Sequence, residues 1–176
     1  HPPWRAAPDA EFTIEIEPGM AFGTGTHETT KMMLSMMLRH LSATPATSVF
    51  DVGSGSGILS IAAERFGHEV FGVEIDPVAV ENAHMNIRRN QCNAITFRAG
   101  TIQPTDAPRP WVLVNILAKI IMDIRADIDR IAHDHLVLSG FLMSQRQALL
   151  QGFAAFEVVD EMQLGEWGCV YLRRKQ

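Results

Sequence analysis

Three glycines and a glutamate in this chain have the types and spacing needed to hold a small ligand. Gly53, Gly55 and Gly57 are spaced two residues apart, directly after the apolar run SVFDV. Such a turn lets a ligand approach the backbone more closely than a Cβ would permit, and the free N–H groups of a following helix favour an anion. Glu74 ends the next apolar run, where a carboxylate can accept hydrogen bonds from a ribose diol. The pattern therefore indicates a ligand that contains a nucleoside.

The glycine spacing distinguishes two classes of cofactor. A dinucleotide site usually has G-x-G-x-x-G, whereas here the third glycine comes one residue earlier and Asp51 precedes the turn. That arrangement favours S-adenosylmethionine, whose carboxylate is a smaller anion than a pyrophosphate. Asp51 is accordingly included with the three glycines among the expected cofactor-binding residues. A purely structural turn is the alternative, and the acid at the next strand end argues against it.

Asn115 interrupts a third apolar run, WVLVNIL at residues 111–117. A buried amide without partners costs about 1–3 kcal/mol, so this side chain needs a role. In one interpretation its carbonyl oxygen accepts a hydrogen bond from an incoming amine and directs the amine toward a methyl donor lying across the glycine turn. In the other, the amide caps a helix that begins near Ala118, as Asn commonly does. The sequence of this strand alone does not separate the two.

The elements that must position these residues alternate between strand and helix patterns. Strand patterns lie at residues 48–54, 69–75, 94–100, 111–117, 135–141, 156–164 and 167–174, and helix patterns lie at 31–41, 57–67, 76–91, 118–132 and 144–153. This alternation predicts a doubly wound α/β fold with a seven-stranded, mostly parallel sheet covered by helices on both faces. A two-residue turn joins the last two strands, which predicts an antiparallel final strand. Ligands in such sheets bind beyond the carboxyl ends of the strands, where the candidate residues are expected to meet.

The region before the first of these strands carries further patterns. Residues 12–18 alternate polar and apolar side chains, which predicts an additional strand. A Gly/Thr loop then leads into the helix at 31–41, with Thr26 expected to cap it and Glu28 in its first turn. Four methionines in that helix are interpreted as core packing rather than as a ligand groove: Met32, Met33, Met36 and Met37.

Composition limits the class of protein. A chain of 176 residues, 47% hydrophobic and 20% charged, is most simply one domain. Its net charge of −5 gives no general attraction to nucleic acid or to an anionic membrane, and no sequence-specific nucleic-acid binding is expected. Cys92 and Cys169 lack the spacing of a disulfide framework or zinc site, so no metal is expected and a cytoplasmic location is predicted. No apolar run approaches the roughly 18 residues that cross a bilayer. Residues 172–176 are interpreted as a solvated tail, with contact to RNA as the alternative.

Six motifs together resemble one family. They are PGMAFGTGTHETT, DVGSGSGILSIAA, GVEIDPVAVENAHMN, NILA, LSGF and GEW, and they occur in the order and at the spacing typical of the ribosomal protein L11 methyltransferases. The resemblance covers the chain from about residue 17 onward. It implies a class I methyltransferase that uses S-adenosylmethionine to methylate the N-terminal α-amine and lysine ε-amines of ribosomal protein L11.

Carried over by position, the resemblance places cofactor contacts at Thr30, Gly53, Glu74 and Asn115. It also places His27 near the mouth of the site, where we favour a loop-stabilising role over contact with substrate. Trp167, in the turn between the last two strands, is either a half-buried turn residue, which we favour, or an aromatic wall beside the target amine.

The sequence departs from the family at three points. Ser54 replaces a common cysteine, which should be harmless because the backbone of the turn carries the function. Glu74 replaces a usual aspartate in a segment that is one residue shorter, so its bond to the ribose requires these two changes to compensate. Residues 1–16 are interpreted as a linker or extension and 17–176 as the catalytic domain, while the family's N-terminal recognition domain is expected to be missing. Such a fragment is expected to bind cofactor yet methylate poorly.

Methyl transfer from a sulfonium is an in-line displacement that needs positioning more than acid or base groups, and we expect no general base. Four other functions remain open. They are methylation of a lysine in another protein, methylation of a small amine, binding of S-adenosylmethionine without catalysis, and nicotinamide-dependent oxidation or reduction. The glycine spacing and the absence of a catalytic Tyr/Lys or His pair argue against the last.

Overall fold

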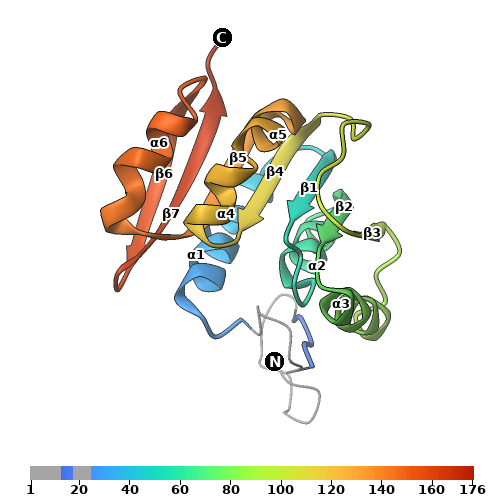
Figure 1. Ribbon diagram of the computed structural model, residues 1–176. Coiled ribbons are helices and arrows are strands. Elements are labelled where there is room, and N and C mark those ends of the chain that lie inside the picture. Colours follow the sequence, from blue (N-terminus) through green and yellow to red (C-terminus); the bar gives the residue numbers. More distant parts are fainter. Residues whose placement is uncertain (1–12, 18–24) are drawn as a thin grey trace.

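Seven strands form one twisted sheet in the computed structural model, which describes residues 13–17 and 25–176 (Figure 1). The strand order is β3-β2-β1-β4-β5-β7-β6. Neighbours from β3 to β5 are parallel, whereas β7 runs antiparallel to both β5 and β6. The predicted doubly wound α/β sheet with an antiparallel last strand is therefore confirmed. The strands are β1 (Ser48–Val52), β2 (Glu69–Glu74), β3 (Ile95–Ala99), β4 (Arg109–Asn115), β5 (Ala132–Leu142), β6 (Phe156–Leu164) and β7 (Trp167–Arg174).

Helices cover both faces of this sheet (Figure 1). The α-helices are α1 (Glu28–Met36), α2 (Ile58–Arg65), α3 (Pro77–Arg89), α4 (Ala118–Asp123), α5 (Arg125–Ile131) and α6 (Arg146–Gly152). Helix α1 continues as a π-helical stretch, Met37–Leu41, and a 3₁₀ turn, Met143–Gln145, precedes α6. Asp76 caps α3 by accepting a hydrogen bond from Val78, and Pro77 occupies the first helical position, where its missing N–H costs nothing.

Side chains alternate across the sheet and so build two hydrophobic cores. Val49 and Trp111 face the core formed with α1, α2 and α3, while their neighbours Phe50 and Val112 face the core formed with α4, α5 and α6. The methionines of the α1 region are almost completely buried in the first core, which confirms the prediction of core packing. They are Met32, Met33, Met36 and Met37. Cys92 and Cys169 are buried free thiols in the same core.

Residues 13–17 were predicted as part of a strand, and this prediction is wrong. The segment is not in the sheet, because its backbone groups bond to asparagine side chains of α3 instead of to a neighbouring strand. The alternating pattern has a different cause: Ile16 is 3% exposed in the first core, and Ile14 packs against that core. The flanking residues 12 and 18 of the predicted strand lie outside the described residues.

Two predictions near the C-terminal half also need correction. The single helix predicted at 118–132 is divided at Ile124, which ends α4 and precedes α5. Neither proline nor glycine marks this break, so periodicity could not reveal it. The predicted solvated tail is partly structured, since β7 continues through Arg174. That residue pairs with Asp129 at 2.9 Å, and Arg173 pairs with Glu157.

None of the helices in the described part of the chain is both long and apolar enough to cross a membrane.

Candidate active site

A cavity of about 360 Å³ opens at the carboxyl edge of the sheet, where the chain order reverses between β1 and β4. This is the position at which open α/β sheets bind their ligands. Its walls come from the ends of β1, β2 and β4, from β5, from the start of β7, and from α1, α2 and α4. The lining residues are His27, Thr29, Thr30, Gly53, Ser54, Gly55, Ile58, Leu59, Glu74, Asn115, Ile116, Leu117, Ile120, Gly140 and Trp167.

The glycine turn between β1 and α2 forms one wall of the cavity. The N–H groups of Gly53 and Ser54 both donate to the carbonyl of Val73, which ties the turn to β2. A Cβ at Gly53 would overlap the side chain of Ile116, which follows the neighbouring strand β4, so only glycine permits this close approach. The Ser54 hydroxyl donates to Val73 at 3.3 Å, and the replacement of the common cysteine is thereby absorbed within the turn.

Glu74 reaches the glycine turn from the end of β2. Its Oε2 accepts a hydrogen bond from Gly55 N at 2.9 Å, and its Oε1 accepts from Asp76 N at 3.0 Å. A carboxylate has about four acceptor positions, so each oxygen retains capacity for a further donor such as a hydroxyl. The extra methylene of glutamate thus brings the carboxylate to the turn and into the cavity wall.

Two buried oxygens on the cavity wall lack partners among the residues that the structure describes. They are Asn115 Oδ1 at the end of β4 and Thr30 Oγ1 in the first turn of α1. Helix α4 begins after Leu117 with no side-chain cap, so the interpretation of Asn115 as its capping residue is wrong. Buried acceptors are nearly always satisfied, and an unsatisfied one beside a cavity indicates a ligand contact.

The backbone around Asn115 depends on Gly140, a residue with no predicted role. Strand β5 has an irregularity between Ser139 and Phe141, and Gly140 lies there with φ +91°. A Cβ at this position would overlap the backbone carbonyl of Ile116, so β5 can approach the residue after Asn115 only at a glycine. Gly140 is the glycine of the LSGF motif, but the need for glycine there becomes clear only from the position of β5 beside Ile116.

His27 and Trp167 are in contact with each other on the wall of the cavity. The cap of α1 is His27 and not Thr26 as predicted, because His27 Nδ1 accepts the hydrogen bond of Thr29 N at 3.3 Å. The two rings lie edge to face with centroids 5.2 Å apart. The favoured loop-stabilising role of His27 is supported by the cap, while both residues also line the cavity. Glu28 lies in the first turn of α1 as predicted.

Asp51 and Gly57 do not line the cavity but lie beneath the turn. Asp51 is completely buried, and its Oδ2 accepts a hydrogen bond from Ser60 Oγ at 2.6 Å. Burial raises the pKa of Asp51 to about 7, because the protein interior penalises the charged form. Gly57 begins α2 against Phe97 and Ala83. Both residues support the turn, and their direct contact with a cofactor stays a prediction.

Apolar residues of the cavity mouth were not predicted as site residues. Leu117 and Ile120 line the cavity although they are 61% and 45% exposed. They follow Asn115 in the sequence, and their exposed side chains at the start of α4 form an apolar entrance. The NILA motif contains Leu117, but the sequence alone does not show that the side chains of this region line a cavity.

Comparison with known proteins agrees with this geometry. The strand order, the antiparallel final strand and the glycine turn at the switch point define the fold of a class I methyltransferase. Within that class, the chain belongs to the ribosomal protein L11 methyltransferase family, whose model (PrmA) matches residues 1–175.

Individual relatives support the assignment. Two proteins named ribosomal protein L11 methyltransferase, from Clostridium perfringens and Thermoanaerobacter pseudethanolicus, are 36% and 38% identical over 171 residues. The alignments cover 94% of this chain but 54% of each relative, so the chain spans about half the length of these proteins. A crystal structure of a ribosomal protein L11 methylase from Lactobacillus delbrueckii superposes with a TM-score of 0.90 at 28% identity, covering 99% of this chain and 93% of that one. The N-methyltransferase NodS of Bradyrhizobium japonicum shares the fold at 12% identity, with a TM-score of 0.68 over 86% of this chain and 90% of that one.

Proposed function

We propose that this chain is the catalytic domain of an S-adenosylmethionine-dependent N-methyltransferase whose target is ribosomal protein L11. The observation that carries the proposal is the buried Asn115 oxygen, which has no partner among the described residues and lies on the wall of the cavity that the glycine turn also lines. Family membership and the names of the relatives support the reaction class and the target. We further propose that the protein acts in the cytoplasm.

The residues present fit S-adenosylmethionine. Glu74 would accept hydrogen bonds from the ribose hydroxyls with its remaining acceptor positions, and the Gly53–Gly55 backbone would lie against the cofactor. The Thr30 hydroxyl, buried and without a partner among the described residues, would bond to a polar group of the methionine portion. The cavity volume of about 360 Å³ lies within the usual range for small-molecule sites.

When bound, the cofactor supplies a methyl group activated by a positively charged sulfur. Asn115 Oδ1 would accept a hydrogen bond from an N–H of the target amine, and this bond would orient the lone pair of the amine nitrogen toward that methyl carbon. The cofactor would supply the methyl carbon and keep the electron pair of its C–S bond, while the proton of the methylated amine would leave to water. Holding the reacting atoms about 3–3.5 Å apart supplies most of the acceleration, so the chain needs no general base.

The entrance favours an amine that arrives neutral. A free lysine has a pKa of about 10.4, and an apolar surrounding lowers the pKa of an amine because it disfavours the charged form. Leu117, Ile120 and Trp167 supply such a surrounding at the mouth of the cavity. Their side chains would also cover the aliphatic part of a lysine.

The cofactor assignment is tested by calorimetric titration with S-adenosylmethionine and S-adenosylhomocysteine. We expect binding that Glu74→Ala weakens more than about tenfold, equivalent to ~1.4 kcal/mol. Glu69→Ala is the matched control, because Glu69 is an exposed residue at the other end of the same strand. Equal affinities for the two variants would remove Glu74 from the site.

The substrate assignment is tested by mass spectrometry of ribosomal protein L11 after incubation with the chain and S-adenosylmethionine. Methyl groups on the N-terminal amine and on lysines are expected. The same assay with free lysine and with unrelated basic proteins distinguishes this target from a small amine or another protein. Methylation of those competitors at an equal rate would contradict the assignment to L11.

A further inference from the structure

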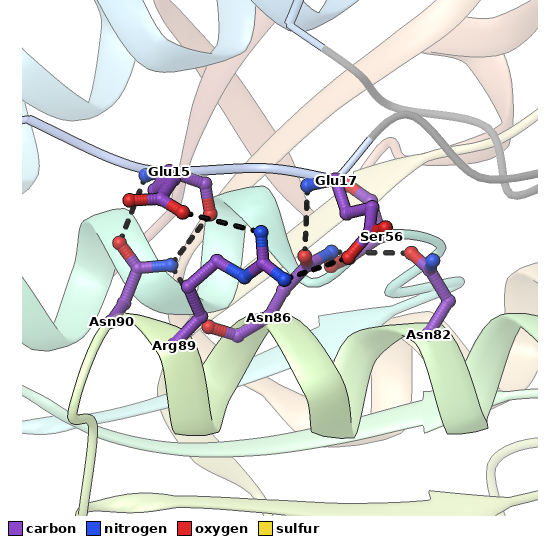
Figure 2. Close-up of polar contacts among 7 residues, drawn as sticks. All are labelled: Glu15, Glu17, Ser56, Asn82, Asn86, Arg89 and Asn90. Carbon is purple, nitrogen blue, oxygen red and sulfur yellow. Dashed lines mark hydrogen bonds and ion pairs between the residues drawn. The ribbon is translucent and has the colours of Figure 1, made fainter. Parts of the chain in front are cut away.

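Asn86 in α3 and Asn90 at its C-cap bond to the extended segment 13–17, and Asn82 in α3 bonds to Asn86 (Figure 2). Asn82 and Asn86 are four residues apart on one face of α3, and Asn90 follows four residues later as the C-cap of the helix. All three are buried, with exposed fractions of 7%, 0% and 4%. Amides in such a position need hydrogen-bond partners, and the segment provides several of them.

Asn90 pairs with a single residue of the segment. Its Oδ1 accepts from Glu15 N at 2.9 Å and its Nδ2 donates to Glu15 O at 2.7 Å, which replaces the two bonds of a strand neighbour. Arg89 adds ion pairs to Glu15 at 3.2 Å and to Glu17 at 2.8 Å. Ile16, between the two glutamates, is buried in the core. The segment is therefore docked by polar and apolar contacts together.

Asn86 bonds to the segment and to the glycine turn at the same time. Its Oδ1 accepts from Glu17 N at 3.0 Å, and its Nδ2 donates to the carbonyl of Ser56 at 2.8 Å and to Asn82 Oδ1 at 3.1 Å. Ser56 lies within the turn that forms a wall of the cavity. The backbone N–H on one side and the backbone C=O on the other fix which end of the amide faces which partner.

This geometry makes the two contacts depend on each other. If Glu17 moves away, Asn86 Oδ1 loses the bond from Glu17 N in a fully buried environment, and a rotation of the amide to find another donor would break the bond to Ser56. If the turn changes shape, the amide loses the partner that orients it toward the segment. Coupling of this kind is reciprocal by thermodynamic necessity.

We propose that Asn86 is a positioning residue that couples the docking of segment 13–17 to the shape of the glycine turn and, through the turn, to binding of S-adenosylmethionine. The inference rests on the proposed function, because it takes the turn to be part of the cofactor site. Asn86 itself does not line the cavity, so its effect on the cofactor passes through the Ser56 carbonyl. Segment docking and cofactor binding each strengthen the other.

Two variants of one residue test the coupling. Glu17→Pro removes the N–H that bonds to Asn86, whereas Glu17→Ala keeps that N–H, and both remove the carboxylate that pairs with Arg89. We expect S-adenosylhomocysteine to bind the Pro variant about fivefold or more weakly than the Ala variant. Equal calorimetric affinities, with or without a lower melting temperature of the Pro variant, would show a purely structural contact and overturn the proposal.

A measurement on the unaltered chain covers the case in which the Pro variant does not fold. S-adenosylhomocysteine is expected to slow hydrogen exchange at the Glu17 amide about fivefold or more, beyond any slowing at amides of β6, on the far edge of the sheet. Binding of the ligand with no such change at Glu17 overturns the coupling alone. No binding of the ligand to the unaltered chain overturns the proposed function, and the coupling with it.

Discussion

Asn86 and Asn115 are two half-to-fully buried amides in one domain, and they differ in how their oxygen atoms are satisfied. Asn86 accepts one hydrogen bond and donates two, all to described groups of the chain. Asn115 Oδ1 is equally inaccessible but has no partner among the described residues. The first amide lies between two backbone segments, whereas the second lies on a cavity wall. Because both residues are asparagines, residue type alone does not distinguish their roles.

The difference separates residues that hold the structure from residues that hold a ligand. An amide whose hydrogen-bonding groups all have partners, like that of Asn86, stabilises the fold and gains nothing from a new partner. A buried oxygen without a hydrogen-bond partner costs free energy, and where it lies on a cavity wall, as Asn115 Oδ1 does, a bound donor can recover that cost.

Asp51 is an intermediate case, because one carboxylate oxygen is bonded to Ser60 and the other has no partner among the described residues. Its pKa is about 7 in the folded chain, against 3.8 when unperturbed. The folded state therefore retains a proton that the unfolded state releases, and stability contributed by Asp51 is present below about pH 4 and is lost as the pH rises through 7.

This loss is measured against Asp51→Asn, which keeps an acceptor for Ser60 and cannot ionise. Relative to that variant, the free energy of unfolding of the unaltered chain should fall by roughly 4 kcal/mol between pH 4 and pH 8. Denaturant titrations across this range provide the test. Parallel pH profiles for the two proteins would show that Asp51 ionises normally.

Removal of the Asn115 side chain should lower turnover more than it lowers affinity for the cofactor. We expect Asn115→Ala to lower the turnover of L11 methylation about 100-fold, because the amine loses its alignment with the methyl group, while affinity for S-adenosylhomocysteine changes much less. Asn93→Ala is the control, since Asn93 is exposed. An equal loss of turnover and affinity would mean that Asn115 is mainly a cofactor contact.

Gly140 sharpens the contrast by supporting Asn115 through the backbone. Gly140→Ala should destabilise the domain by about 2 kcal/mol more than Gly67→Ala, because a Cβ at Gly140 overlaps Ile116. Gly67 has nearly the same φ, +92° against +91°, but a Cβ added there would meet no atom within 4 Å, so the pair separates steric overlap from backbone strain. Thermal unfolding gives the comparison, and equal destabilisation would place the whole effect in φ.

The smallest effect is expected at the cap of α1. His27→Ala removes the acceptor of the Thr29 N–H and should lower the free energy of unfolding by about 1 kcal/mol. His133→Ala, at an exposed position, should be close to neutral. If His27→Ala were also neutral in stability but lowered turnover, the residue would belong to the substrate side of the site rather than to the helix.

The central features of the site could be predicted because a parallel sheet brings strand ends together. The glycine turn, Glu74 and Asn115 each follow an apolar run, and this was sufficient to place them at one edge. The antiparallel last strand followed from a two-residue turn. Such features follow from local sequence patterns, which reveal the strands and helices, and from the rules by which the chain connects them.

Features that depend on a distant partner could not be predicted in this way. The alternation at 13–17 is the same whether its backbone bonds to a strand or to the asparagines of α3. Glycine is required at position 140 because the backbone carbonyl of Ile116 lies where a Cβ would be. The break between α4 and α5 at Ile124 has no proline or glycine to mark it. His27 competes with Thr26 for the cap of α1, and propensity favoured the wrong residue.

The role of Asn115 is tested with two ligands that differ at one position. Sinefungin carries an amine-bearing carbon where S-adenosylhomocysteine has sulfur, so its amine occupies the place of the transferred methyl group. If Asn115 Oδ1 is the acceptor for the target amine, the unaltered chain should prefer sinefungin by about tenfold or more, and Asn115→Ala should abolish that preference. The same preference in both proteins, measured by calorimetry, would contradict the role assigned to Asn115.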